Sequence, residues 1–279
     1  MAKAGANQQT KLLTRAKEIN NEIEEHQAAI AGLSQERREC LETLIDGGMT
    51  QAQLAEHLSM SRGRVSQLLS AGVRPERAFF GSGKVTVAIG GKPESGRADG
   101  KTQVVASSEA HSAAEQIIAL VRTLGLDAES EIVPPPGMVQ LNRPNLVVLT
   151  SPRLLPFVGQ MLDADPHLGF GVDDEGWFLV DKASGDKLHS PSDRGETTDL
   201  GYIGRLPRPD GRGTFLYFAG LHAPGTAGAV HYVENNLPEL YREVKTRRWS
   251  ALISCEFDGK SRKILSSKLI TPLYRHDNA

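Results

Sequence analysis

One group of polar side chains, gathered within seven positions of the chain, has the types and spacing best suited to hydrogen-bonding chemistry. They are Ser61, Arg62, Arg64, Ser66 and Gln67. Arg forms two hydrogen bonds to the guanine edge in the major groove, and Gln pairs in the same way with the adenine edge. Facing outward near the start of one helix, these side chains predict a recognition helix that contacts double-stranded DNA.

Three turns further along the chain carry glycines, hydroxyls or positive charges directly after predicted strands. Their residues are Gly90, Gly91, Ser151, Arg153, His222, Gly225 and Thr226. If the strands are parallel, these turns meet at one edge of the sheet, which is where ligands bind in open α/β sheets. Backbone N–H groups at the helix start of Gly225 and Thr226 would favour an anion, and Arg153 and His222 would add donors. A small phosphate or carboxylate ligand is therefore predicted.

The same turns have a simpler alternative explanation. The sequence contains neither a GxGxxG fingerprint nor a GxxxxGK[ST] loop. Glycines at such turns often only let a helix pack closely on a strand. In that case the domain would serve oligomerisation rather than ligand sensing.

Signals for catalysis or metal binding are weaker. The chain has no GxSxG, no HExxH and no neighbouring Cys/His pair, and its two cysteines stand far apart. We therefore assign no catalytic residue, no metal and no cofactor, and expect no enzyme. The alternative is a nucleotide- or sugar-processing enzyme with an appended DNA-binding module, in which His222 pairs with Asp199 or Glu234, or Ser151 acts as a nucleophile.

Composition limits the class of protein. At 279 residues the chain is long enough for two domains with separate cores. Its formal net charge of -2 means that DNA binding must be local rather than the work of a polycationic surface. No apolar run reaches the length of a membrane span, and the first residues lack an apolar signal core, so we expect no membrane partner and a cytoplasmic location.

The polar group at positions 61–67 lies in a segment that predicts two short helices joined by a turn. Thr50 and Ser61 are suited to N-cap the first and second helix. Ser59 stands in the turn where glycine is usual, which requires a left-handed Ser at some energetic cost. The apolar positions predicted to pack the two helices together are Leu54, Ala55, Leu58, Val65, Leu68 and Leu69.

Together with the preceding stretch Glu36–Met49, this segment resembles the helix-turn-helix of sigma-factor region 4 and related bacterial regulators. The resemblance spans roughly Gln35 to Gly72. It implies a DNA-binding domain at residues 35–72. Two alternatives stay open: an ordinary helical hairpin inside a larger core, or a scaffold whose motif contacts RNA polymerase or another protein.

Residues 1–34 predict one long helix. Its apolar positions alternate steps of four and three, the spacing of a heptad seam: Leu12, Ala16, Ile19, Ile23, His26, Ile30 and Leu33. Such a seam predicts a coiled coil. A homodimer or higher homo-oligomer would suit an operator with two half-sites. Alternatively, the helix packs against its own helix-turn-helix.

After a linker at residues 73–83, strand and helix patterns alternate through residues 84–279. Apolar runs such as Lys84–Ile89 and Asn145–Thr150 predict buried parallel strands separated by helices. Turn residues at 183–186 and at Asp258–Gly259 predict antiparallel hairpins. We therefore expect a Rossmann-like α/β domain with antiparallel additions, serving ligand sensing or oligomerisation.

The chain as a whole resembles a class of actinobacterial proteins in which a sigma-like helix-turn-helix precedes an α/β domain. The phrases that carry this resemblance are Pro75–Phe80, Gly204–Arg212 and Ala219–Gly228. It implies an architecture and no activity. The combined prediction is a sequence-specific, dimeric, DNA-binding transcriptional regulator whose C-terminal domain senses a small anion.

Overall fold

The structure is a computed structural model that describes residues 2–70, 75–94 and 104–276. Backbone contacts divide the chain into two compact units, Met1–Ala78 and Phe79–Ala279. Within the described residues, no helix combines the length and the apolar character needed to cross a bilayer.

The first unit is made of three helices: α1 (Ala2–Asp46), α2 (Gln51–His57) and α3 (Arg62–Ser70). Helix α1 continues without a break through the boundary predicted between residues 34 and 35, so that boundary is wrong. The reason is that Leu41, near the end of α1, is buried with Leu54 of α2 and Val65 of α3. The last turns of the long helix therefore belong to the helix-turn-helix core.

The predicted heptad seam lies on α1 and its side chains are exposed. Leu12, Ile30 and Leu33 are 63%, 62% and 66% exposed. The seam therefore does not pack against α2 and α3 of its own chain, which was the alternative. Instead, one copy of the chain leaves a row of apolar side chains in water.

The second unit is built around an eight-stranded mixed sheet. The strand order is β12-β11-β9-β10-β5-β1-β4, and β13 pairs with β11. Strands β10, β5, β1 and β4 run parallel, whereas β9 is antiparallel to both of its neighbours. The predicted combination of parallel strands with antiparallel additions is confirmed. The strands are β1 (Val85–Gly90), β4 (Ala128–Val133), β5 (Leu146–Leu149), β9 (Thr198–Pro207), β10 (Thr214–Gly220), β11 (Trp249–Phe257), β12 (Ile264–Leu269) and β13 (Tyr274–Arg275).

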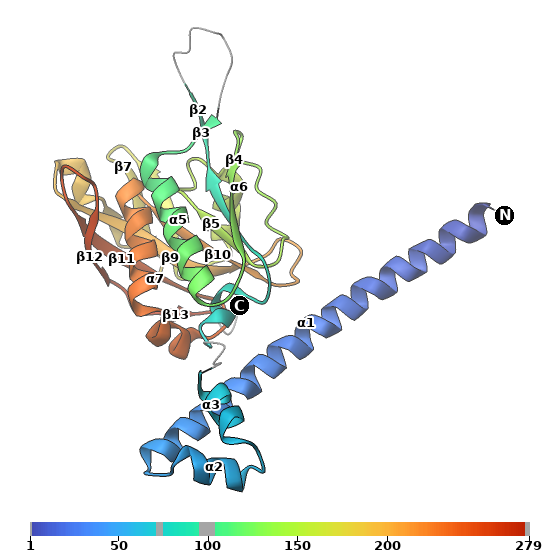
Figure 1. Ribbon diagram of the computed structural model, residues 1–279. Helices are drawn as coiled ribbons and strands as arrows, with labels where there is room; N and C mark the ends of the chain where they lie inside the picture. The colour runs from blue at the N-terminus through green and yellow to red at the C-terminus, as the bar shows by residue number, and fades with distance from the viewer. Residues whose placement is uncertain (1, 71–74, 95–103, 277–279) are drawn as a thin grey trace. The chain divides into compact units, whose positions relative to one another are not determined.

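The sheet is covered on both faces. Helices α5 (Ser108–Thr123) and α7 (Ala223–Val244) lie against one face (Figure 1). Helix α6 (Pro156–Leu162) and a three-stranded sheet formed by residues 168–173, 176–181 and 187–189 cover the other face. Successive side chains of a strand point to opposite faces. Accordingly, Val87 and Ile89 join the core beneath α5 and α7, whereas Ala88 joins the core beneath α6.

The chain changes direction across β1. From β1 it passes through α5 to β4 on one side, and it then returns to β5 on the other side. A reversal of this kind leaves a crevice at the carboxyl ends of the two strands that flank it. Gly90 ends β1, and Thr150 directly follows β5. Two of the predicted turns thus lie together at this edge.

Several local elements differ from the prediction. Helix α6 begins at Pro156, five residues after the predicted turn residue Ser151, because a separate turn forms first and proline suits the first helical position. Phe80 is buried in the second unit, so the predicted linker 73–83 contributes to its core. Residues 73 and 74 lie outside the described residues. The remaining short elements are α4 (Arg77–Phe80), β2 (Lys92–Pro93), β3 (Val104–Val105), β6 (Leu168–Asp173), β7 (Gly176–Asp181), β8 (Lys187–His189) and the 3-10 turn Pro191–Arg194.

Candidate functional site

The helix-turn-helix is organised by two capping residues. The hydroxyl of Thr50 accepts the N–H of Gln53 at 3.3 Å, and the Gln53 side chain accepts the N–H of Thr50 at 2.8 Å. This reciprocal pair is a capping box, which satisfies two donors that the start of α2 leaves unpaired. Ser61 accepts the N–H of Arg64 at 3.1 Å at the start of α3. Both predicted N-caps are confirmed.

The turn between α2 and α3 needs an unusual backbone. Ser59 has φ of 52°, the left-handed conformation expected where related turns carry glycine. The N–H of Met60 donates to Ala55 at 2.9 Å and closes the turn. Leu58 is 41% exposed, so its predicted place in the core is wrong. Leu58 is the C-cap residue of α2 and lies outside the small core that Leu54, Ala55 and Val65 form.

The residues predicted to contact DNA lie on the open side of α3. Ser61, Arg62, Arg64, Ser66 and Gln67 are all exposed, whereas Val65 between them is fully buried. The Arg64 guanidinium lies 3.5 Å from the Gln67 side-chain oxygen, so these two groups are presented side by side. The helix thus holds a row of donors over an apolar anchor. This is the arrangement that a recognition helix uses in a groove.

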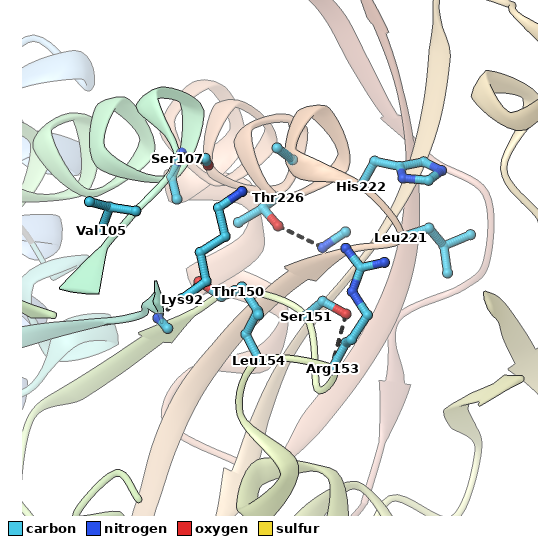
Figure 2. A pocket seen from close by; sticks show the side chains of 14 residues that line it. Lys92, Val105, Ser107, Thr150, Ser151, Arg153, Leu154, Leu221, His222 and Thr226 are labelled. Atoms are coloured by element: carbon cyan, nitrogen blue, oxygen red, sulfur yellow. Dashed lines mark hydrogen bonds between the residues drawn. The ribbon is translucent and has the colours of Figure 1, made fainter. Parts of the chain in front are cut away.

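A second candidate site is a cavity in the α/β unit. It has a volume of about 190 Å³ and lies at the carboxyl ends of β1, β5 and β10 (Figure 2). Of the predicted ligand residues, those that line it are Gly90, Ser151, Arg153, His222 and Thr226. The structure therefore brings five of the seven predicted ligand residues together at one cavity. Three segments more than fifty residues apart meet there because their strands are parallel neighbours in the sheet.

Gly91 and Gly225 do not line the cavity, and this part of the prediction is wrong. The N–H of Gly225 donates to the Asp199 carboxylate at 2.7 Å, and a side chain at Gly225 would overlap the Leu200 carbonyl. The N–H of Gly91 donates to Val133, and a side chain there would overlap Val104. Both glycines therefore permit close packing, which was the alternative explanation.

Asp199 occupies the anion-binding position that the sequence assigned to a ligand. It is fully buried at the start of β9 and accepts hydrogen bonds from Ser190 at 2.6 Å and from the His222 backbone at 3.1 Å, besides the one from Gly225. Burial raises the pKa of Asp199, against the lowering effect of these hydrogen bonds. The backbone N–H groups of His222 and Gly225, at the start of α7, are thus satisfied by the protein itself.

The charge of the cavity comes from side chains. Lys92 and Arg153 extend toward the starts of α5 and α7 (Figure 2). Ser107, the N-cap of α5, and Ala110 of α5 also line the cavity, so the positive end of that helix dipole faces it, whereas Asp199 already caps the start of α7. Among the described residues that line it, none is a carboxylate. An anion is the charge type that this environment favours.

Lys92 and Ser107 are cavity residues that sequence reasoning missed. Lys92 falls at the start of a glycine- and charge-rich stretch that follows the predicted strand Lys84–Ile89. Ser107 directly precedes helix α5, and a serine at an N-cap position was the available signal. It accepts the N–H of Ala110 at 3.2 Å.

Thr150 forms a strained part of the cavity wall. Its φ is 110°, a rare value for a β-branched residue. Its hydroxyl accepts the N–H of Gly90 at 3.1 Å, and its carbonyl accepts the buried Tyr217 hydroxyl at 2.8 Å. Strained backbone costs about 1–3 kcal/mol and persists only where its surroundings over-determine it, most often at functional sites. These contacts hold the end of β5 in one geometry.

The His222 ring does not form the acid–base pairs considered from the sequence. Its Nε2 atom lies 2.7 Å from Asp193, and both side chains are partly exposed. Asp199 contacts only the backbone of His222. Glu234 lies on an exposed position of α7, three turns further along the helix. The imidazole is therefore oriented by Asp193, a residue that the sequence did not suggest.

Taken together, the geometry defines a chain with a helix-turn-helix unit and an α/β unit that holds a cationic cavity. Comparison with known families agrees for the first unit: residues 29–74 match the family model described as Sigma-70, region 4. The match covers the end of α1 together with α2 and α3. The chain thus carries a DNA-binding helix-turn-helix of this type. Neither the curated proteins nor the solved structures gave a match to the chain.

Proposed function

We propose that this protein is a sequence-specific transcriptional regulator whose α/β unit binds a small anion. The DNA-binding part rests on the family match and on the outward row of donors on α3. The ligand-binding part rests on one observation: Lys92, Arg153 and the start of α5 surround a cavity whose described lining contains no acid. The cavity also lies where the strand order of the mixed sheet reverses.

The DNA contact is tested by single substitutions on α3. Arg62→Ala and Arg64→Ala should each weaken specific binding by about 1–3 kcal/mol, because a good base contact contributes that much. Both side chains are exposed, so folding should be retained. The measurement is a titration against genomic fragments that the wild-type protein selects, at one fixed salt concentration. Arg242→Ala, on exposed α7 surface, is the matched control; wild-type affinity in both α3 variants would contradict the assignment.

The anion site is tested by calorimetry on the full chain. Pyrophosphate should bind, and Lys92→Gln or Arg153→Gln should weaken it by roughly tenfold, since a hydrogen bond to a charged group contributes about 1.5–3 kcal/mol. Arg242→Gln removes an equal charge elsewhere and should leave the affinity unchanged. If phosphate, pyrophosphate and dicarboxylates all fail to bind, the anion site is contradicted and the α/β unit is left as an assembly module.

We also propose that α1 forms a coiled coil with a second copy of the chain. The support is the seam of exposed apolar side chains at heptad spacing. Ile23→Glu and Ile30→Glu should lower the mass in sedimentation and weaken binding to a two-half-site operator more than to a single half-site. Lys17→Glu, an exposed residue outside the seam, is the control. An unchanged mass in the Ile variants would contradict self-association through α1.

Binding without turnover is part of the proposal. The Ser151 hydroxyl accepts the N–H of Arg153 at 3.4 Å, and the His222 ring is held by Asp193, so each side chain already has a structural contact. A ligand in the cavity would alter DNA affinity only by binding two arrangements of the dimer unequally. Calorimetry with and without operator DNA measures this coupling directly.

A further inference from the structure

A second cavity lies beside the first on the α6 side of the sheet. Its volume is about 430 Å³, and it is enclosed by α6 and the β6–β7 hairpin. Phe170 and Trp177 supply aromatic surface, and Lys182 and Asp163 supply polar groups. Arg153 lines both cavities. The cationic cavity and this aromatic groove are therefore neighbours that share the Arg153 side of their walls.

The cationic cavity is too small to hold most ligands by itself. Small-molecule sites usually measure about 300–1,000 Å³, and this cavity measures about 190 Å³, whereas the neighbouring one, at about 430 Å³, falls within that range. A ligand whose anionic end lies in the cationic cavity would therefore extend beyond it, and the space that shares Arg153 is next to it. A ligand with an anionic end and an apolar ring would use both.

The aromatic groove is held in place by the core beneath it. Phe170 packs on the buried Tyr202 with ring centroids 6.1 Å apart, and both Phe170 and Trp177 pack against the α6-side core. Lys182 donates to the Asp165 carbonyl at 2.5 Å and to the Leu162 carbonyl at 3.4 Å, which fixes its stem along the groove. Rigid aromatic surface flanked by a few fixed polar groups is suited to a flat heterocycle.

We propose that the two cavities form one nucleotide site, with the 5′-phosphates between Lys92 and Arg153 and the base against Trp177. This inference rests on the proposed anion site and names its ligand class. The cationic cavity supplies the phosphate donors, and Arg153 bridges the two ends. The Asp163 carboxylate at the groove is an acceptor suited to a base amino group.

The test compares ligands that differ only in the nucleoside. The full chain is titrated with four nucleoside 5′-diphosphates, with pyrophosphate and with ribose 5-phosphate. At least one nucleoside diphosphate should bind about 5- to 150-fold more tightly than pyrophosphate, because base–aromatic stacking contributes about 1–3 kcal/mol and 1.4 kcal/mol is tenfold. It should also change tryptophan fluorescence. The chain has two tryptophans, and Trp249 is fully buried, so that signal reports Trp177.

The variant Trp177→Leu should remove the advantage of the nucleoside diphosphate while leaving pyrophosphate affinity unchanged. The unchanged pyrophosphate affinity also shows that the variant is folded. Trp177→Phe should keep part of the advantage, and Arg153→Gln should weaken both ligands. Equal affinity for nucleoside diphosphates and pyrophosphate would overturn the nucleotide site but leave the anion site standing. Ribose 5-phosphate bound as tightly as any nucleotide would also overturn it, and no binding by any of these ligands would overturn the anion site itself.

Discussion

The two units of the chain assemble their candidate functional residues over very different sequence distances. At the start of α3, the five predicted DNA contacts fall within seven positions, 61–67, and one buried residue, Val65, sets which way they face. In the α/β unit, the cavity residues run from Gly90 to Thr226 on four strands, two helices and the turns between them. The first arrangement follows from helical periodicity, whereas the second exists only when the sheet has formed.

The cores of the two units differ in the same way. The helix-turn-helix is held by a cluster of four buried side chains, Leu41, Leu54, Ala55 and Val65. The α/β unit has two extensive cores, one on each face of its sheet. In a small core, each buried side chain contributes a large share of the stability of its unit. The recognition surface should therefore be the more fragile of the two sites.

The largest expected effect comes from the small core. Leu54→Ala should lower the stability of the helix-turn-helix by about 2–5 kcal/mol, because it removes a fully buried side chain and leaves a cavity. DNA binding should be lost while the thermal transition of the α/β unit stays in place. Calorimetric melting together with DNA titration checks this result. A shift of the α/β transition as large as the loss in the helix-turn-helix would contradict the independence of the two cores.

A buried polar cluster in the α/β unit gives the next effect. Asp165 accepts from the Tyr202 hydroxyl at 2.8 Å and lies 3.3 Å from His276 Nε2, which also lies 3.0 Å from Ser250. Burial alone would raise the pKa of Asp165, but the hydrogen bonds from His276, Ser250 and the His167 backbone outweigh it and lower the pKa from 3.8 to about 2. The cluster ties the end of the described chain to the loop before β6.

The lowered pKa of Asp165 predicts acid sensitivity with a definite sign. The ionised carboxylate stabilises the fold above its unfolded pKa of 3.8, and the contribution of about 2 kcal/mol is lost as the pH falls from about 4 to 2. Asp165→Asn should therefore be less stable than wild type at pH 6, with the difference shrinking toward pH 2. Urea unfolding across this pH range measures it, with exposed Asp174→Asn as the control. A difference that is constant with pH would show that Asp165 acts only through packing.

A matched pair of glycines gives the smallest effects and the sharpest contrast between the units. Gly63 on α3 has only the Ser61 hydroxyl within 4.0 Å, so Gly63→Ala should stabilise the helix by about 0.5–1 kcal/mol. Gly225 meets the Leu200 carbonyl and Asp199, so Gly225→Ala should destabilise the α/β unit by about 1–3 kcal/mol. Thermal melting of both variants compares them. Destabilisation by Gly63→Ala would mean that α3 is packed more tightly than its exposure indicates.

Sequence reasoning succeeded where the cause of a structure is local. Thr50 and Ser61 were identified as N-caps because a cap bonds to an N–H two or three positions away, and the structure has both bonds. The left-handed Ser59 followed from its place in the turn. The boundary between residues 34 and 35 failed for the opposite reason, because the helix is continued by the burial of Leu41 against residues that come later in the chain.

In the α/β unit, the sequence determined that parallel strands would bring their turns to one edge of the sheet. Five of the seven predicted ligand residues therefore line the same cavity. Only the tertiary structure decided that Asp199 would cap α7, that Lys92 would face Arg153, and that an aromatic groove would adjoin them. The physical reason is range. A helix cap or periodic face is set by bonds within about four residues, whereas these contacts depend on strand order and on which face each side chain occupies, and a shift of one residue would reverse that face.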